Sequence, residues 1–358
     1  MNAGSPLIFS LSESRSLGQA IAAAAGLEPA PLEERGFEAG EFKLRPLVPV
    51  RDRDVYVVQL LANSPDATVS ERLLRLLLLA FGLRDAGARR LTAFTPYLCF
   101  ARKDRRTQTR DPVTVRYVAQ LLESAGIGRL VALDVHNPAA FDNAFRIPTD
   151  HLSALPLFVS HFAAASLPDA PLAVASPDVG GVKRAQLFRE QLERRLGRDV
   201  ELVFIEKRRA RGVMSGGAVI GDVAGRDAIV LDDLCASGGT LIRAASALRS
   251  AGARRVQVAF THAPHPPGLR ALAAAGEIDG IVLTDSTGPA MQGTALELGG
   301  RVTVLSIAPL LGAALSRMLA HRPLLAPGPA DLEAIDRALV AYQPRVEAAA
   351  DTILRGLR

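Results

Sequence analysis

The hydrophobic positions of the chain repeat one local arrangement three times. Each copy has a helical pattern, then a glycine, then arginine, then a short apolar run, and the copies occupy residues 85–94, 124–133 and 250–259. Glycine suits the left-handed position at which a helix ends. A short apolar run after such a helix is typical of a buried strand in a parallel sheet. The repeated order of helix, cap and strand predicts an α/β fold built on mostly parallel sheets.

The pattern breaks in two places. The first break, near residues 150–156, separates two α/β halves, and the second is a stretch rich in proline and alanine at residues 323–329. Beyond the second break the apolar residues repeat at helical spacing, so we expect a helical tail there. The expected divisions are a first domain at residues 1–150, completed by about 307–320, a second domain at 151–306 and a helical tail at 321–358.

Composition narrows the class of protein. Hydrophobic residues make up 49% of the 358 residues and no low-complexity stretch interrupts them, so we expect a folded chain. The most apolar stretch, residues 73–83, is too short to span a bilayer and contains Arg75, and the amino terminus lacks the features of a signal peptide. The two cysteines, Cys99 and Cys235, have no metal-like spacing, which fits the reducing cytoplasm.

Charge indicates the kind of partner. The net charge is +5 and the pI is about 9.6, which favours anionic partners such as nucleic acid or phosphorylated metabolites. The basic residues are mostly arginines spread along the chain, tryptophan is absent and only 4 tyrosines occur. These features favour phosphorylated metabolites, and we expect neither a nucleic-acid partner nor a membrane partner.

The sharpest chemical signal is a loop between a buried strand and a helix. After the apolar strand at residues 228–231 come Asp232 and Asp233, and small residues continue to Thr240, where a helix opens. Such a loop points backbone N–H groups at one spot and binds phosphate well, while two carboxylates can hold sugar hydroxyls or a metal. The structural alternative is an ordinary turn capped by Ser237. The adjacent acids favour a ligand, because they repel each other unless something binds them.

This loop resembles the ribose-phosphate loop of type I phosphoribosyltransferases and their relatives. Among these, the ribose-phosphate pyrophosphokinases match best, because further motifs agree in order over about residues 7–315. The resemblance implies two similar phosphoribosyltransferase-like domains, each a mostly parallel sheet flanked by helices. Ala236 and Ser237 depart from the commonest family form, which has Asp and Thr there. The residues expected to bind ribose 5-phosphate are Asp232, Asp233, Ala236, Ser237, Gly238, Gly239 and Thr240.

Two motifs resemble the ATP-binding loops of the family. Residues 37–41 resemble Phe-x-Asp-Gly-Glu, a loop that in the family reaches the ATP of a neighbouring subunit, where the phenylalanine stacks on adenine. Residues 96–114 resemble a basic loop that clamps the triphosphate. Ala39 and Lys103 replace an Asp and a Gln of the family, so we expect a base site that is less strict for adenine. The residues expected to bind ATP are Phe37, Glu41, Arg102, Lys103, Asp104 and His136.

Three further segments resemble the catalytic and metal-binding parts of the family. Residues 133–136 resemble Asp-Leu-His, residues 176–185 match almost letter for letter, and residues 206–209 resemble Lys-Arg-Arg at the root of a mobile catalytic loop. The glycine-rich residues 210–218 would form the lid. The resemblance implies Mg²⁺ as the cofactor. The expected metal ligands are His136 and Asp178, and the expected catalytic residues are Lys207 and Arg209.

The resemblance implies a ribose-phosphate diphosphokinase, in which the 1-hydroxyl of ribose 5-phosphate attacks the β-phosphorus of ATP and AMP leaves. Catalysis then consists of positioning and charge neutralisation. The expected partners are ATP, ribose 5-phosphate and further copies of the chain in a homo-oligomer with active sites at subunit interfaces. Two alternatives stay open. A catalytically silent regulatory homologue would be expected to lose His136, Lys207 or the acidic pair, and a phosphoribosyltransferase would not need the ATP-binding loops.

Overall fold

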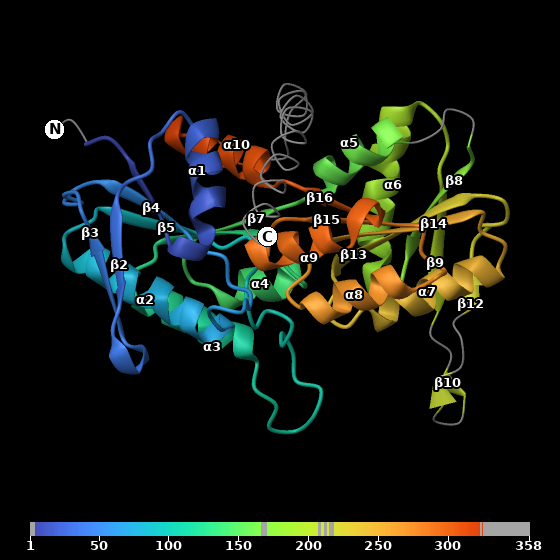
Figure 1. The fold of residues 1–358 in the computed structure, drawn as a ribbon, viewed down its shortest axis with the longest axis horizontal. Helices are drawn as coiled ribbons and strands as arrows, with labels where there is room; N and C mark the ends of the chain where they lie inside the picture. The colour runs from blue at the N-terminus through green and yellow to red at the C-terminus, as the bar shows by residue number, and fades with distance from the viewer. Residues whose placement is uncertain are drawn as a thin grey trace. The chain divides into compact units, whose positions relative to one another are not determined.

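The computed structural model describes residues 4–165, 170–206, 209–210, 213–214, 218–322 and 324 (Figure 1). These residues form two compact units, each with its own sheet and hydrophobic core. Unit 1 comprises the described residues up to Ser153, residues 286–288 and the described residues from Ile307 on, whereas unit 2 comprises Ala154–Asp285 and Pro289–Ser306. The expected tail helix, apart from the few described residues up to 324, and Lys207 lie outside the described residues.

Unit 1 is built on a five-stranded sheet in the order β1-β4-β5-β6-β7, and each of these pairings is parallel. The strands are β1 (Leu7–Ser10), β4 (Asp54–Val58), β5 (Arg90–Phe94), β6 (Arg129–Leu133) and β7 (Thr149–Leu152). The helices are α1 (Arg15–Ala24), α2 (Val69–Asp85), α3 (Thr114–Ser124), α4 (Pro138–Ala144) and α10 (Ala308–Leu319). The late helix α10 packs against α1, where a Cβ on Gly312 would come within 2.3 Å of the Ala24 Cβ.

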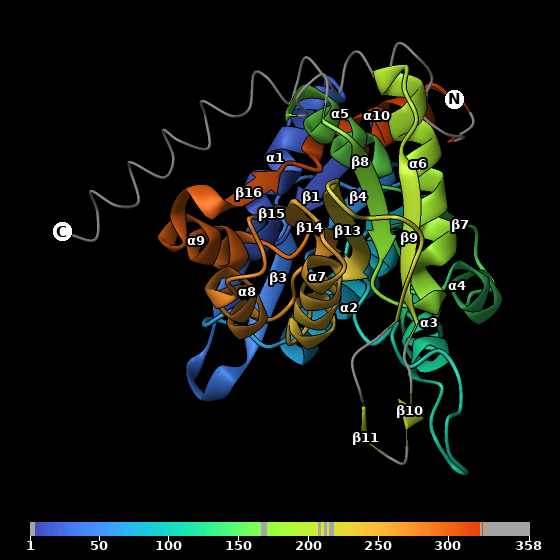
Figure 2. The ribbon, with the colours of Figure 1, turned by 90° about the vertical axis from the view of Figure 1, so that its right-hand side faces the viewer.

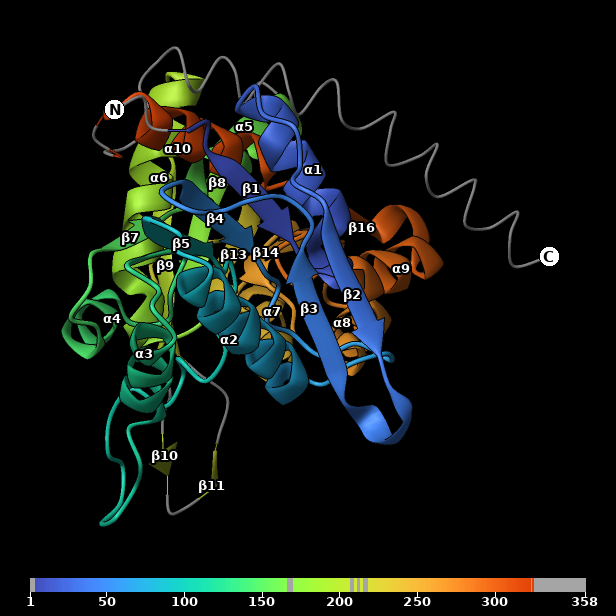
Figure 3. The same ribbon diagram turned by 90° about the vertical axis from the view of Figure 1, so that its left-hand side faces the viewer.

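A separate antiparallel hairpin of unit 1, β2 (Leu32–Gly36) and β3 (Phe42–Pro46), lies beside α2 (Figure 3). Arg75 of α2 holds it: its guanidinium lies 4.6 Å from the ring centre of Phe42 and 3.8 Å from a carboxylate oxygen of Glu34. Ser12 also donates a hydrogen bond of 2.7 Å to Glu34. The hairpin is therefore fixed to α2 close to the loop that joins its two strands.

The most apolar stretch of the sequence, residues 73–83, lies within α2. The helix begins after Thr68, whose side chain accepts a hydrogen bond from the Glu71 N–H and so caps the first turn. Leu73, Leu76 and Leu83 are buried, so the stretch packs into the core of unit 1. None of the helices in the described residues is long and apolar enough to cross a membrane.

Unit 2 is built on a seven-stranded sheet in the order β12-β9-β8-β13-β14-β15-β16, parallel except for the edge strand β12. The strands are β8 (Leu172–Ser176), β9 (Glu201–Glu206), β12 (Ala218–Ile220), β13 (Asp227–Leu234), β14 (Arg255–His262), β15 (Gly280–Thr284) and β16 (Val302–Leu305). The helices are α5 (Leu155–Ala165), α6 (Val182–Leu196), α7 (Gly239–Ser250), α8 (Pro266–Ala274) and α9 (Pro289–Glu297). Helices α5 and α6 pack together on one face of the sheet, and α7 to α9 cover the other (Figure 2).

The joint of helix, glycine and strand that the sequence predicts is confirmed in all three copies. Gly87, Gly126 and Gly252 adopt φ angles of 87°, 93° and 92°, in the left-handed region. After each glycine, the next N–H donates back to a carbonyl in the last turn of the helix. The three bonds are Ala88 to Leu83 at 3.1 Å, Ile127 to Leu122 at 3.2 Å and Ala253 to Leu248 at 3.0 Å. The α/β fold with mostly parallel sheets therefore rests on the same cap in both units.

The strand before the phosphate loop is longer than predicted. We expected it to end at Leu231, with the two acids following it, but β13 runs on to Leu234 and carries both acids. The reason is that the ladder with β14 continues, so that Asp232 pairs with Phe260 and Leu234 with His262. Side-chain polarity does not prevent a backbone from continuing a ladder whose partner strand is equally long. The register of β14 therefore fixes the backbone on which both acids stand.

Replacing Gly252 by alanine should destabilise the protein by about 1–2 kcal/mol, because an L-residue is strained in the left-handed conformation. Gly82, exposed within α2 with no atom within 4 Å of an added Cβ, is the matched control. Gly82→Ala should stabilise the protein by about 1 kcal/mol, because alanine favours the helix. Free energies of unfolding from urea denaturation measure both effects. A Gly252→Ala variant as stable as the wild type would contradict the role of the left-handed cap.

Candidate functional site

An arginine of α6 holds the two acids of β13 in unit 2. The Nη1 atom of Arg184 lies 2.9 Å from Oδ1 of Asp233 and 3.6 Å from Oδ1 of Asp232. Asp233 is buried at 4% exposure, and Asp232 is partly buried. Burial, and then the neighbouring carboxylate of Asp233, raise the pKa of Asp232 to about 8. One guanidinium thus faces the carboxyl groups of two successive residues, and Oδ1 of Asp232 also accepts the Asp233 N–H at 2.9 Å.

The expected phosphate loop connects β13 to α7. Its first residue, Cys235, donates its N–H to the His262 carbonyl at 2.8 Å, and Gly238 has a φ of 79° just before the helix begins. The Gly238 carbonyl accepts the N–H of Ile242 at 2.9 Å, which starts the hydrogen bonding of α7. The first N–H groups of a helix have no partner within the helix and carry its positive end. The loop can therefore bind an anion at the start of α7.

Gly268 of α8 lies directly against this loop. A Cβ on Gly268 would come within 2.0 Å of the Ala236 carbonyl oxygen and 2.9 Å of its carbon. A Cβ on Gly238 would in turn come within 3.0 Å of the Gly268 carbonyl oxygen. The two backbones therefore approach this closely only because neither residue has a side chain. Gly268 was not predicted from the sequence, although the Pro-Pro-Gly run that opens α8 was an available signal.

The segment after β8 is folded by its own side chains. Ser176 donates its hydroxyl to the Asp178 carbonyl at 2.6 Å, and Oδ1 of Asp178 accepts the Gly181 N–H at 3.3 Å. A Cβ on Gly181 would come within 2.6 Å of the Ser176 hydroxyl, so this position requires glycine. Asp178 thus caps the turn that leads into α6, and α6 supplies Arg184. Unit 2 therefore brings together Arg184, which follows this turn, and the acids of β13.

Asp111 organises the basic loop of unit 1. Its Oδ2 atom accepts hydrogen bonds from the N–H groups of Thr107 and Gln108, at 2.9 and 3.0 Å, and from the Lys103 ammonium at 2.6 Å. These bonds, above all the one from Lys103, hold the pKa of Asp111 well below its usual range. Lys103 therefore braces the loop, whereas Arg102 is exposed. The role of Asp111 was not predicted from the sequence, although an Asp before a proline is a common turn signal.

Asp104 joins the basic loop to the segment that follows β6. Its Oδ2 atom accepts a hydrogen bond of 2.7 Å from the side-chain amide of Asn137, the residue after the exposed His136. The Val135 N–H donates to Nε2 of His151 at 3.1 Å, so that nitrogen carries no proton. Unit 1 therefore brings the basic loop and the histidine segment together at the carboxyl edge of its sheet, where ligands of such sheets bind.

The loop at residues 37–41 joins the two strands of the hairpin. Phe37 is 44% exposed, and the Arg35 guanidinium lies 5.3 Å from its ring centre. The Phe37 N–H donates to the Glu41 carbonyl at 2.7 Å, which closes the loop. Between them Ala39 has a φ of 66°, in the left-handed region. Aspartate adopts this conformation more readily than alanine, so the Asp of the family suits this backbone better than Ala39 does.

The expected catalytic segment is described only in part. Arg209 opens β10 (Arg209–Ala210), which pairs antiparallel with β11 (Val213–Met214), and Lys207 lies outside the described residues. A short hairpin, formed by β10 and β11, therefore lies between the Lys-Arg-Arg motif and the end of the glycine-rich stretch. Among the described residues, no group of three or more His, Cys, Asp or Glu side chains could hold a metal ion.

Two models of known families match the chain. The model for the N-terminal domain of ribose phosphate pyrophosphokinase matches residues 6–126, and the model for the phosphoribosyl transferase domain matches residues 158–279. The first match contains the hairpin loop and the basic loop of unit 1. The second contains the acids of β13 and the phosphate loop. The expected ligand-binding loops of both units therefore lie within matched stretches, except for the segment with His136, which lies between the two.

Relatives and a solved structure resemble most of the chain. The ribose-phosphate pyrophosphokinase of Parasynechococcus marenigrum is 36% identical over 313 residues, which cover 87% of this chain and 90% of the relative. That of Granulibacter bethesdensis is 37% identical over 312 residues, which cover 87% and 96%. The crystal structure of phosphoribosylpyrophosphate synthetase from Mycobacterium smegmatis has a TM-score of 0.77 and 30% identity over 88% of this chain and 99% of that chain. The chain belongs to the ribose-phosphate pyrophosphokinase family.

Proposed function

We propose that the protein is a ribose-phosphate diphosphokinase, which transfers the β,γ-diphosphoryl group of ATP to the 1-hydroxyl of ribose 5-phosphate and releases AMP. The observation that carries this proposal is the acidic pair of β13 beside the phosphate loop, with Arg184 in contact with both acids. A sugar phosphate fits both parts, because its phosphate accepts from the loop N–H groups while its hydroxyls donate to the carboxyl groups.

ATP is proposed to bind through the loops of unit 1. Arg102 is exposed in a loop that Asp111 braces, which leaves its planar guanidinium for the phosphates. Phe37 and Glu41 are exposed on the hairpin loop, where the ring can stack on adenine and the carboxylate can bond the base edge. Lys207 and Arg209 are proposed to stabilise the charge on the group that is transferred.

Mg²⁺ is proposed as the cofactor, with His136 and Asp178 as its protein ligands, as the resemblance implies. When bound, the ion neutralises charge on the ATP phosphates. Mg²⁺ usually keeps several waters and binds through one or two carboxylates plus substrate phosphates. A chain whose described residues hold no larger cluster of metal-binding side chains fits this mode of binding.

The chain is proposed to form a homo-oligomer in the cytoplasm. Four large apolar side chains lie exposed at helical spacing on two helices of unit 1: Leu74 and Leu78 on α2, and Tyr117 and Leu121 on α3, each 45–49% exposed. A second copy that covers them would remove this apolar surface from water. The two cysteines are buried and free, which suits a reducing compartment. Analytical ultracentrifugation of the purified protein would give the assembly.

The reaction is tested by incubating purified protein with ATP, Mg²⁺ and ribose 5-phosphate and following the products by phosphorus NMR. We expect AMP and a sugar carrying a diphosphate at C1, with no AMP when ribose 5-phosphate is left out. Binding of both substrates without AMP would instead support the silent regulatory homologue. Hydrolysis of ATP to ADP would contradict the proposal, because the diphosphoryl transfer cleaves ATP at the α–β bridge.

The two acids of β13 should differ in what they do for stability. Asp233→Asn should lower the free energy of unfolding by about 1–3 kcal/mol, because it removes the buried carboxylate that Arg184 contacts at 2.9 Å. Asp232→Asn should leave stability unchanged or raise it, because it removes a carboxyl group whose ionised form is disfavoured by burial and by the neighbouring Asp233. Both variants should raise the KM for ribose 5-phosphate. Equal losses of stability would contradict this division of roles.

Gly268→Ala should raise the KM for ribose 5-phosphate by about tenfold to a hundredfold, because its Cβ displaces the Ala236 carbonyl and with it the phosphate loop. The KM for ATP should stay close to that of the wild type. Gly293→Ala on α9, where an added Cβ meets no atom within 4 Å, is the matched control and should leave both values unchanged. If the two variants behave alike in steady-state kinetics, Gly268 does not position the loop.

A further inference from the structure

The hairpin of β2 and β3 has an inner face of half-buried residues, and this face carries one acid. Side chains alternate between the two faces of a strand, so the register of the hairpin places five such residues together. They are Leu32, Glu34, Phe42, Leu44 and Pro46. Leu32 and Leu44 pack against the hydrophobic core of unit 1. Apolar packing therefore explains the other residues of this face but not Glu34.

The carboxyl group of Glu34 is buried with weak compensation. Its side chain is 7% exposed, and its Oε1 atom accepts a hydrogen bond of 2.7 Å from Ser12. Its Oε2 atom accepts no hydrogen bond from the described residues. Guanidinium nitrogens of Arg75 and Arg15 lie 3.8 and 3.9 Å from its two oxygens. Burial raises the pKa of Glu34, because it disfavours the ionised form.

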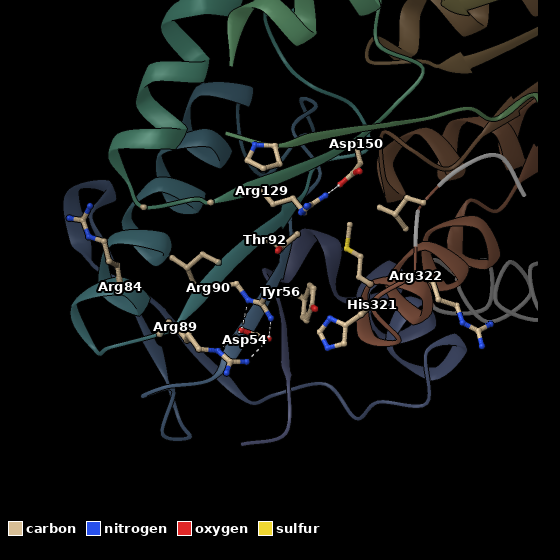
Figure 4. Close-up of a pocket in the computed structure, with 17 residues that line it drawn as sticks. Asp54, Tyr56, Arg84, Arg89, Arg90, Thr92, Arg129, Asp150, His321 and Arg322 are labelled. Carbon is tan, nitrogen blue, oxygen red and sulfur yellow. Dashed lines mark hydrogen bonds and ion pairs between the residues drawn. The ribbon is translucent and has the colours of Figure 1, made fainter. Parts of the chain in front are cut away.

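An acid at the start of β4 shows the contrast. Asp54 accepts hydrogen bonds of 3.0 and 2.7 Å from Arg89 and of 2.9 and 2.5 Å from Arg90 (Figure 4). These bonds, above all those from Arg90, hold the pKa of Asp54 well below its usual range. Asp54 therefore joins neighbouring strands as a well-paired ion. Glu34 has no such bonds to arginine, so the stability of the hairpin does not account for an acid at its position.

Arg75 of α2 contacts both strands of the hairpin. Its guanidinium lies 3.8 Å from Glu34 on β2 and 4.6 Å from the ring centre of Phe42 on β3. On the helix side, Oε1 of Glu71 accepts hydrogen bonds of 3.2 and 2.9 Å from the same guanidinium. A guanidinium at this distance from an aromatic ring is attracted to it. Two acids, one on the helix and one on the hairpin, therefore direct one cation onto the Phe42 ring.

The Phe42 ring lies at the base of the loop that is proposed to bind the base of ATP. Phe42 directly follows Glu41, the last residue of that loop, and the register places it across from Gly36, which precedes Phe37. The Phe37 N–H donates to the Glu41 carbonyl at 2.7 Å, so the two ends of the loop are tied together. A contact that holds Phe42 therefore holds both ends of the loop.

We propose that Arg75 and Glu34 are positioning residues for ATP. Glu34 directs the Arg75 guanidinium onto Phe42, and this contact holds the loop at residues 37–41 in the orientation that binds the nucleotide base. The proposal rests on the proposed function, which assigns that loop to ATP. Neither residue has to contact the substrate, because a binding group that is displaced by about 1 Å can lose on the order of a hundredfold in efficiency.

The first test measures binding of ATP with Mg²⁺ to the intact protein by equilibrium dialysis, together with steady-state kinetics. Arg75→Gln should weaken ATP binding and raise the KM for ATP by about tenfold, because the loop loses its orientation. The kcat and the KM for ribose 5-phosphate should stay close to those of the wild type. Arg75→Lys keeps a cation beside the Phe42 ring and should recover most of the affinity.

The matched control is an ion pair on the other face of the same hairpin. Arg45 donates a hydrogen bond of 2.6 Å to Glu33, directly across from it, and does not join the hairpin to α2. Arg45→Gln should therefore bind ATP as the wild type does. If Arg45→Gln weakens ATP binding as much as Arg75→Gln does, any loss of charge on the hairpin has this effect, and the proposal fails.

Glu34→Leu separates positioning from stability. Leucine completes the apolar inner face and removes a buried carboxyl group, so the melting temperature should stay the same or rise. ATP binding should nevertheless weaken, because Arg75 loses the acid that directs it. The double variant with Arg75→Gln should bind ATP no more weakly than Arg75→Gln alone, since both changes remove one contact. A Glu34→Leu variant that binds ATP like the wild type, or that melts lower and loses affinity for both substrates alike, would overturn the proposal.

Phe37→Ala distinguishes failure of this proposal from failure of the proposed function. If Phe37→Ala weakens ATP binding and Arg75→Gln does not, the loop binds ATP without help from Arg75, and only the positioning role is wrong. If neither variant weakens it, the loop does not bind ATP, and the assignment of Phe37 is wrong together with the positioning role.

Discussion

The ion pair between Arg184 and the acids of β13 is the interaction on which the unit 2 site depends. Asp232 and Asp233 are successive residues of β13, and the pairing of β13 with β8 and β14 fixes their backbone. The two carboxyl groups therefore stay close together. The charge that balances them must come from another element, and it comes from the first turn of α6. The turn before α6 is capped by Asp178, so the two segments most like the family are joined through one guanidinium.

Acids play opposite roles in the two units. In unit 2 the acids of β13 stand at the proposed ligand site, and the pKa of Asp232 is raised by burial and by its neighbour. In unit 1 Asp111 stabilises the fold of the basic loop, and the hydrogen bonds that it accepts lower its pKa. An aspartate thus stands at the proposed ligand site in one unit and, in the other, organises a loop whose arginine faces solvent.

Much of this could be predicted from the sequence, because local signals fix local structure. The three glycine caps were predictable from the helix that precedes each and the apolar strand that follows it. The start of α7 after a loop of small residues was predictable in the same way, whereas phosphate binding by that loop stays a prediction. The end of β13 was not, since it depends on the length of β14, a partner more than twenty residues later. The roles of Arg184 and Gly268 likewise depend on which elements pack together, which no single stretch of sequence reveals.

The repeated joint carries different ion pairs in the two units. A helix that ends in Gly-Ala-Arg-Arg places its second arginine at the first position of the next strand, beside the start of the neighbouring strand. In unit 2 the fold uses only the first arginine for an aspartate, and the second is exposed. In unit 1 both arginines bond to Asp54, although the register is the same in the two units: Asp54 lies across from Arg90 and Asp227 lies across from Arg255. The register of the strand pair therefore does not by itself decide whether the second arginine of the motif reaches the aspartate.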